Sequence, residues 1–176
     1  MEDTHTYFNL LSRMLQYPDE SYLQGLPQLE AAAGRLPRGE PRVAFEKFMC
    51  HLRAQNPFQL QERYTAAFDL NPATTLNMTY HIWGDGEKRA GALTRLRQIY
   101  HDAGYETTTG ELPDYLPLML EFVSIFPAAR HIGLIQQCLK ALETVVARLR
   151  QIVPPYAELL QPLLGICNDQ KAARIH

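Results

Sequence analysis

The residues most able to do chemistry, the histidines, cysteines and serines, show no spacing that would build a catalytic or metal site. No two histidines have the spacing of paired ligands on one helical face; they are His5, His51, His81, His101, His131 and His176. No serine lies in a GxSxG context, and no cysteine lies in a recognisable nucleophile motif. The sequence therefore indicates neither an enzyme active site nor a bound metal.

A glycine-containing turn at residues 84–88 (GDGEK) superficially resembles a phosphate-binding loop. It lacks both a preceding strand and the Gly-Lys-Ser/Thr order that such a loop requires, so we interpret it as a turn between two helices. The neighbouring Trp83 is more typical of a side chain that covers the core than of one that stacks on a ligand.

The unusual feature of the sequence is an acidic stretch. Residues 105–126 contain four acids and no Lys or Arg, so this stretch carries a charge of −4 in a chain whose formal charge is −2. A helix that starts near Pro113 would hold Asp114 in its first turn, where the helix dipole favours a carboxylate. The same helix would align four apolar side chains along one side: Tyr115, Leu118, Met119 and Phe122.

Two interpretations of this stretch remain open. An apolar floor rimmed by carboxylates could receive an amphipathic helix that carries arginine. Alternatively, Asp114 caps a helix and Glu121 lies on a solvated face. Composition and spacing alone favour the second interpretation.

The elements that must position these residues are helices, because apolar side chains recur at helical spacing along nearly the whole chain. Helix starts are predicted at Asp19, Pro41 and Pro57, since these residue types suit a cap or a first turn. Further helices are expected over residues 73–83, 87–103, 113–126 and 129–152, with a last one after residue 155. The sequence thus predicts an all-α bundle of about seven to eight helices, with residues 1–176 forming a single domain.

Charge and composition exclude several classes of protein. The chain has 17 Lys and Arg against 19 Asp and Glu, so it lacks the basic surplus of a nucleic-acid-binding protein. No apolar run approaches the ~20 residues that span a bilayer, and the acidic N-terminus is not a signal peptide. Three widely separated cysteines suit the reducing cytoplasm. Whether the protein is a monomer or a dimer stays open.

Several motifs, in matching order and spacing, resemble the NarJ family, the delta-chain assembly chaperones of respiratory nitrate reductase and related molybdoenzymes. They are ERYTAAFD (residues 62–69), ATTL (73–76), HIWG (81–84), RAGAL (89–93), YHDAGY (100–105) and ELPDYLPLMLEF (111–122). The segment LQYPD at residues 15–19 is also similar to the family. Tyr115 departs from the common pattern, which has a histidine there, and a tyrosine cannot become cationic near neutral pH.

The resemblance implies an all-α fold shared with the TorD/DmsD class of redox-enzyme maturation proteins, and a role that is not enzymatic. It implies a cofactor-free, cytoplasmic chaperone that binds the N-terminal segment of the catalytic (alpha) subunit of a molybdoenzyme. Such a chaperone holds the apoprotein while the molybdenum cofactor is inserted.

The same resemblance implies which residues bind the peptide. Glu111, Asp114 and Glu121 would engage basic groups of the partner's leader-like segment, and nearby aromatic and apolar side chains would supply contact area. Core packing remains the better interpretation for Phe68, and both roles stay open for Tyr64 and Trp83. The full candidate set is Tyr64, Phe68, Asp69, His81, Trp83, Glu111, Asp114, Tyr115, Leu118, Glu121 and Phe122.

Two alternatives remain from other classes. The helical bundle could itself carry a small molecule, either the molybdenum cofactor or a nucleotide, although the basic residues around Lys88 and Arg95 are more simply a solvated helix face. The chain could also be a degenerate relative that acts only as a helical adaptor.

Overall fold

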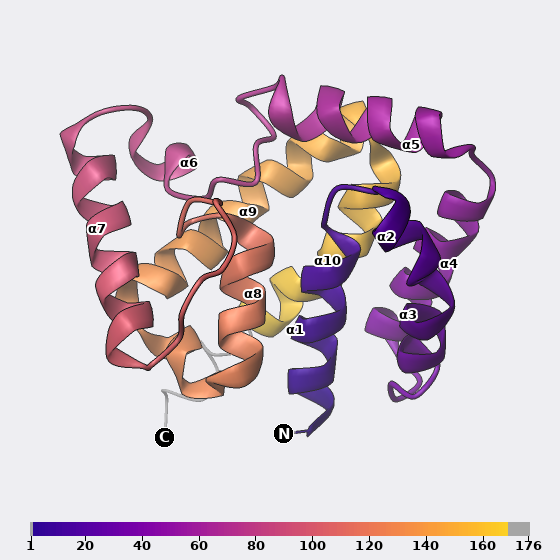
Figure 1. The fold of residues 1–176 in the computed structure, drawn as a ribbon, viewed down its shortest axis with the longest axis horizontal. Coiled ribbons are helices and arrows are strands. Elements are labelled where there is room, and N and C mark those ends of the chain that lie inside the picture. The colour runs from indigo at the N-terminus through magenta and orange to yellow at the C-terminus, as the bar shows by residue number, and fades with distance from the viewer. Residues whose placement is uncertain (1, 169–176) are drawn as a thin grey trace.

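The computed structural model describes residues 2–168, and helices account for most of them (Figure 1). Within that range eight of the α-helices have at least eight residues, which confirms the predicted all-α bundle. One of the six histidines, His176, lies outside the described residues. The helices are α1 (Glu2–Met14), α2 (Glu20–Gln24), α3 (Leu26–Ala33), α4 (Glu40–Arg53), α5 (Pro57–Tyr64), α6 (Tyr80–Trp83), α7 (Glu87–Asp102), α8 (Leu116–Ile125), α9 (Gly133–Ile152) and α10 (Pro154–Asn168), with a π-helical turn, η1 (Thr65–Asp69), and a 3-10 turn, η2 (Pro127–His131).

The core is built on helices from both halves of the chain. Helix α1 packs along α8, and α10 packs between α9 and α4 (Figure 1). Helix α5 crosses over the ends of these pairs, and α7 flanks them on the opposite side from α2, α3 and α4. Side chains such as Leu11, Met119 and Leu142 are completely buried where the helices meet.

Local sequence signals explain where several helices begin. The Asp19 carboxylate accepts a hydrogen bond from the Tyr22 amide at 2.8 Å and caps α2. Asn56 and Gln59 form a reciprocal capping box at the start of α5, where Pro57 occupies the first turn. These contacts confirm the predicted starts at Asp19 and Pro57. The helix after Asp19 is shorter than expected, because Gly25 separates α2 from α3.

The prediction of a helix over residues 73–83 is wrong for most of that range, where only α6 is helical. The preceding loop instead pairs with the segment before α8: the Leu116 amide donates to the Leu76 carbonyl at 2.8 Å, and the Met78 amide donates to the Asp114 carbonyl at 3.0 Å. Thr74 donates its hydroxyl proton to the Ala67 carbonyl, a side-chain bond of the kind that competes with helix formation.

Helix α8 also begins later than expected, at Leu116 rather than near Pro113, with Pro117 in its first turn. The residues before it form a turn closed by the Tyr115 amide and the Leu112 carbonyl at 3.0 Å. Asp114 therefore lies ahead of the helix instead of inside its first turn. Because Asp114 precedes α8, its carboxylate bonds to the loop before α6 instead of capping the helix.

Candidate functional site

A groove opens where the end of α1, the loop before α8 and the first turns of α8 meet. It has a volume of about 240 Å³ and brings together four residues of the predicted set, Glu111, Tyr115, Leu118 and Glu121. The other lining residues are Gln16, Tyr17, Asp19, Thr109 and Pro117. Segments that lie some hundred residues apart in the sequence thus form one surface.

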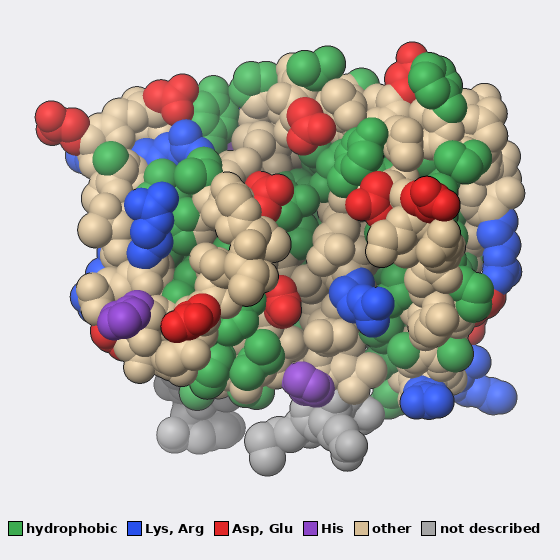
Figure 2. All heavy atoms as spheres, in the orientation of Figure 1, with side chains coloured by type: hydrophobic (Ala, Val, Ile, Leu, Met, Phe, Trp, Pro, Cys, Tyr) green, Lys and Arg blue, Asp and Glu red, His purple; other side chains and the backbone are tan. Residues whose placement is uncertain are grey.

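The groove is acidic at its rim and apolar at its floor. Asp19, Glu111 and Glu121 supply three carboxylates, and no Lys or Arg is among the lining residues. Tyr17, Tyr115 and Leu118 supply the apolar surface. Figure 2 shows this face of the molecule, where acidic side chains surround hydrophobic ones over the region between α1, α5 and the loop before α8.

The Tyr115 side chain is half-buried at the base of the groove. A hydrogen bond between its hydroxyl and that of Tyr64 fixes its position. The Tyr64 hydroxyl lies 2.8 Å from that of Tyr115 and donates its proton to the Leu15 carbonyl at 2.8 Å. Since Tyr64 has only one hydroxyl proton, Tyr115 donates to Tyr64 and presents its ring to the groove. Burial, together with the nearby charges of Glu111 and Asp69, raises the pKa of Tyr115 to about 12.

One further carboxylate of the predicted set, Asp69, is close enough to this tyrosine pair to affect both pKa values, and the groove carboxylate Glu121 affects a third tyrosine. Asp69 is exposed on η1, and its charge contributes to the raised pKa values of both Tyr64 and Tyr115. Burial, together with the nearby Glu121 carboxylate, raises the pKa of Tyr105. The negative charge is therefore spread around the aromatic floor.

Asp114 is placed differently from its neighbours, because its side chain is completely buried. One carboxylate oxygen accepts from the Thr79 amide at 3.1 Å and from the Thr79 hydroxyl, and the other accepts from the Asn77 side-chain amide at 3.1 Å. The Arg89 guanidinium lies 3.8 Å away and completes the pairing of the charge. In this conformation the carboxylate ties the loop before α6 to the start of α8 and is covered from solvent.

The remaining predicted residues lie beneath the groove or away from it. Phe68 and Phe122 are core side chains, as the packing interpretation of Phe68 expected. His81 donates its Nε2 proton to the Thr75 carbonyl at 2.7 Å, and burial lowers the pKa of this histidine. Trp83 is half-buried at the end of α6, next to the Gly84 turn. Neither His81 nor Trp83 lines the groove.

Sequence reasoning missed five groove residues: Gln16, Tyr17, Asp19, Thr109 and Pro117. The signal for the first three was present, because they belong to the LQYPD segment directly after α1. Their contribution depends on α1 packing against α8, which the sequence does not show. The Tyr17 ring packs edge-on against Tyr64 with centroids 5.5 Å apart, so the segment after α1 continues the aromatic floor.

The structure gives little support to a small-molecule site around the glycine turn. Arg89 is already engaged by Asp85 at 2.9 Å and by Asp114, while Lys88 and Arg95 are exposed on α7. Among residues 2–168, no three His, Cys, Asp or Glu side chains are grouped so that they could hold a metal ion. In the same range no helix is both long and apolar enough to cross a membrane.

Comparison with known proteins places these features in a family. The chain is 32% identical over 167 residues to the nitrate reductase molybdenum cofactor assembly chaperone NarJ of Bacillus subtilis, which covers 95% of this chain and 91% of that protein. It is 32% identical over 162 residues to NarJ of Escherichia coli K12, covering 90% of this chain and 68% of that protein.

A solved structure, a redox enzyme maturation protein from Archaeoglobus fulgidus, has the same fold. It superimposes with a TM-score of 0.63 and 21% identity over 92% of both chains. The family model described as nitrate reductase delta subunit matches residues 27–161, which include α5, η1, the loop before α8 and α8 itself. The chain therefore belongs to the nitrate reductase delta subunit family, as the motifs around the groove indicated.

Proposed function

We propose that this protein is an assembly chaperone for the catalytic subunit of a nitrate reductase or a closely related molybdoenzyme, and that its groove binds the N-terminal segment of that subunit. The observation that carries the proposal is the groove with three carboxylates, no Lys or Arg and an aromatic floor. The names of the NarJ relatives, which are assembly chaperones rather than catalysts, support this role.

The groove chemistry fits a short segment that is both basic and apolar. Lys or Arg side chains would pair with Asp19, Glu111 and Glu121, and an apolar side chain between them would pack on Tyr115 and Leu118. Because these carboxylates are solvent-accessible, the ion pairs mainly set orientation and association rate. The apolar contacts supply most of the affinity.

Four other candidate residues lie outside the groove lining and position it or add charge to it. Tyr64 fixes the Tyr115 ring through the hydroxyl pair, and Phe68 packs on Tyr64 with ring centroids 4.8 Å apart. Asp114 holds the loop segment that leads into α8. Asp69 adds negative charge beside Tyr115. We assign direct contact with the peptide to the groove residues and a positioning role to these four.

The chaperone role follows from preferential binding to one state of the partner. A protein that binds the exposed N-terminal segment of the apo subunit stabilises that open state by mass action. Release follows once insertion of the molybdenum cofactor buries or reshapes the recognised segment. No covalent step and no cofactor of the chaperone itself is required.

Calorimetric titration tests the proposal. The probe is a peptide with the first ~15 residues of the host's nitrate reductase catalytic subunit, a length of about four helical turns. We expect saturable one-to-one binding that weakens about tenfold in the E111Q/E121Q double variant, because two of the three groove carboxylates are lost.

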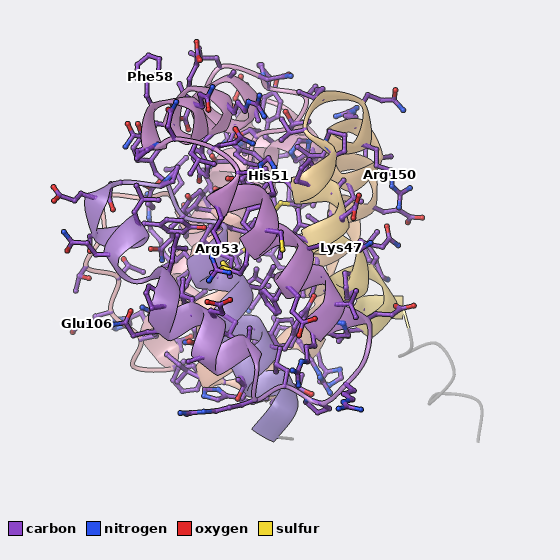
Figure 3. All side chains as sticks on the ribbon, turned by 90° about the vertical axis from the view of Figure 1, so that its right-hand side faces the viewer. Lys47, His51, Arg53, Phe58, Glu106 and Arg150 are labelled. Carbon is purple, nitrogen blue, oxygen red and sulfur yellow. The ribbon has the colours of Figure 1, made fainter. Side chains whose placement is uncertain are left out.

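The matched control is Glu106→Gln, which removes an acid of the same loop that does not line the groove. Figure 3 shows Glu106 at the edge of the molecule, pointing away from the helices. The control should bind the peptide like the unaltered chain. Absence of saturable heat, or equal weakening by both changes, would contradict the proposed site.

A further inference from the structure

One exposed row of side chains on α5 and η1 is not used by the groove. Phe58 and Leu70 are the most exposed large apolar side chains described, at 73% and 75% exposure. Figure 3 shows Phe58 pointing away from the molecule at one end of α5. Glu62 and Ala66 are exposed between them, and we call Phe58, Glu62, Ala66 and Leu70 the α5 row.

The π-helical turn is what aligns this row. In an ideal α-helix, twelve residues turn Leu70 about 120° away from Phe58. In η1 the Leu70 amide donates to the Thr65 carbonyl at 3.0 Å, five residues back, so each turn holds more residues than an α-helical turn. This wider turn rotates Leu70 back toward the face that carries Phe58. The row extends over roughly 18 Å.

The α5 row borders the groove. The Gln61 side-chain amide donates to the Pro18 carbonyl at 3.0 Å, which joins α5 to the segment after α1. Tyr17 lines the groove and packs against Tyr64 of α5, while Asp69 of η1 lies close to Tyr115. A chain that leaves the groove past Tyr17 therefore reaches the α5 row directly.

The size and charge of the row indicate its occupant. The four residues of the row, which lie on α5, on η1 and directly after η1, fall far short of the ~20–30 residues a side that a stable protein–protein interface uses, so the row alone cannot hold a dimer. A segment already tethered in the groove has a high effective concentration and needs only a small contact. The row carries the Glu62 carboxylate and no cation, which suits an apolar face that also bears Lys or Arg.

We propose that the α5 row binds a second segment of the same client: an amphipathic, Lys- or Arg-bearing helix that adjoins the groove-bound N-terminal segment. Its apolar side chains, about three turns apart, pack on Phe58 and Leu70, and its cation pairs with Glu62. This inference rests on the proposed function and adds a second, weaker contact that lengthens the recognised sequence.

Two peptides separate this contact from groove binding. One holds the first ~15 residues of the host's nitrate reductase catalytic subunit, and the other holds the first ~45, enough for a linker and a helix of three to four turns. The test variant is F58S/L70S. The matched control is V43S/I152S, which replaces exposed apolar side chains of α4 and α9 outside the groove and the row.

We expect the longer peptide to bind the unaltered chain and the control about tenfold more tightly than the shorter one. F58S/L70S should lose this gain and still bind the shorter peptide normally, which also shows that it is folded. If F58S/L70S still binds the longer peptide more tightly, or if the unaltered chain does not, the second contact is overturned while groove binding stands. Failure of the shorter peptide to bind any form overturns the proposed function, and this inference with it. A fall in sedimentation mass for F58S/L70S would instead identify the row as a self-association surface and overturn the inference.

Discussion

Asp114 is a buried carboxylate whose partners lie on the loop before α6 and on α7. Its oxygens take hydrogen bonds from Asn77 and Thr79, and its charge is paired by Arg89. Asp114→Ala leaves these buried donors without their acceptor and removes one of the two carboxylates that pair with the largely buried Arg89 guanidinium, so we expect the free energy of unfolding to fall by about 3 kcal/mol. Asp114→Asn keeps one acceptor and should cost roughly half as much.

Urea unfolding of the two Asp114 variants checks this expectation. Glu106→Ala, which removes an exposed acid of the same stretch, serves as the control and should unfold at an unchanged urea concentration. An Asp114→Ala variant as stable as the unaltered chain would show that the buried cluster contributes nothing, and would return Asp114 to the list of direct peptide contacts.

Tyr115 stays uncharged near neutral pH, where a histidine can become cationic. Its pKa is raised to about 12, so it stays neutral below that value. Tyr115→His introduces a group with an ordinary pKa of about 6.5 beside Glu111 and Asp69. Protonation would place a cation where the peptide's cations bind, so we expect the affinity for the N-terminal peptide to fall as the pH drops through about 6.5.

Calorimetry from about pH 5.5 to 8 compares Tyr115→His with Tyr115→Phe, which has no titrating group at this position. Tyr115→Phe should keep the pH dependence of the unaltered chain, whatever its absolute affinity. Identical pH profiles for the histidine and phenylalanine variants would refute the electrostatic explanation.

The acidic character of the groove could be predicted from the sequence, and the separate role of Asp114 could not. Glu111 and Glu121 line the groove as their stretch suggested. Asp114 belongs to the same stretch, but its environment is set by Asn77 and Thr79, more than thirty residues away. No local pattern reports that their loop folds back onto the start of α8.

At the scale of elements, one buried hydroxyl donates a hydrogen bond into the π-helical turn. Thr74 is completely buried and donates to the Ala67 carbonyl inside η1. Thr74→Val keeps the side-chain shape but leaves this carbonyl without that donor, so we expect a loss of about 1–2 kcal/mol in the free energy of unfolding. The matched control is Thr94→Val, since the Thr94 hydroxyl donates to the Ala90 carbonyl at an exposed site.

Thermal and urea unfolding give the two comparisons. A Thr74→Val loss no larger than that of Thr94→Val would mean that the hydroxyl does not support the turn. Because the turn aligns the α5 row, the same variant should also lose part of the extra affinity for the ~45-residue peptide.

Elements were predictable where their signals are local. The Asn56–Gln59 capping box with Pro57, and the carboxylate of Asp19, mark helix starts that neighbouring residues alone determine. The segment over residues 73–83 was not predictable in the same way, since Leu76 and Met78 bond to the backbone around Asp114 instead of to their own neighbours. These backbone hydrogen bonds between distant segments prevent a helix there, although the apolar residues have helical spacing.

At the scale of the whole molecule, buried tyrosine hydroxyls connect different elements of the fold. Tyr64 donates to the Leu15 carbonyl at 2.8 Å, Tyr100 to the Pro113 carbonyl at 2.6 Å, and Tyr22 to the Met14 carbonyl at 3.0 Å. Burial raises the pKa of each of these tyrosines above the ordinary value of 10.0. The fold therefore strongly prefers the neutral, hydrogen-bonding form.

This preference predicts the response of the protein to alkali. Because the folded pKa values lie above the unfolded value of about 10, the tyrosines contribute their full stability below pH 10, and this contribution is lost as the pH rises above it. We expect the urea midpoint to fall steeply between about pH 10 and 11, together with a cooperative rise in tyrosinate absorbance. The double variant Y64F/Y100F should be less stable at neutral pH, since the Leu15 and Pro113 carbonyls lose their donors, yet its stability should fall less steeply in alkali. A midpoint that stays constant to about pH 11, or equal slopes for the two proteins, would show that these tyrosines do not couple the fold to pH.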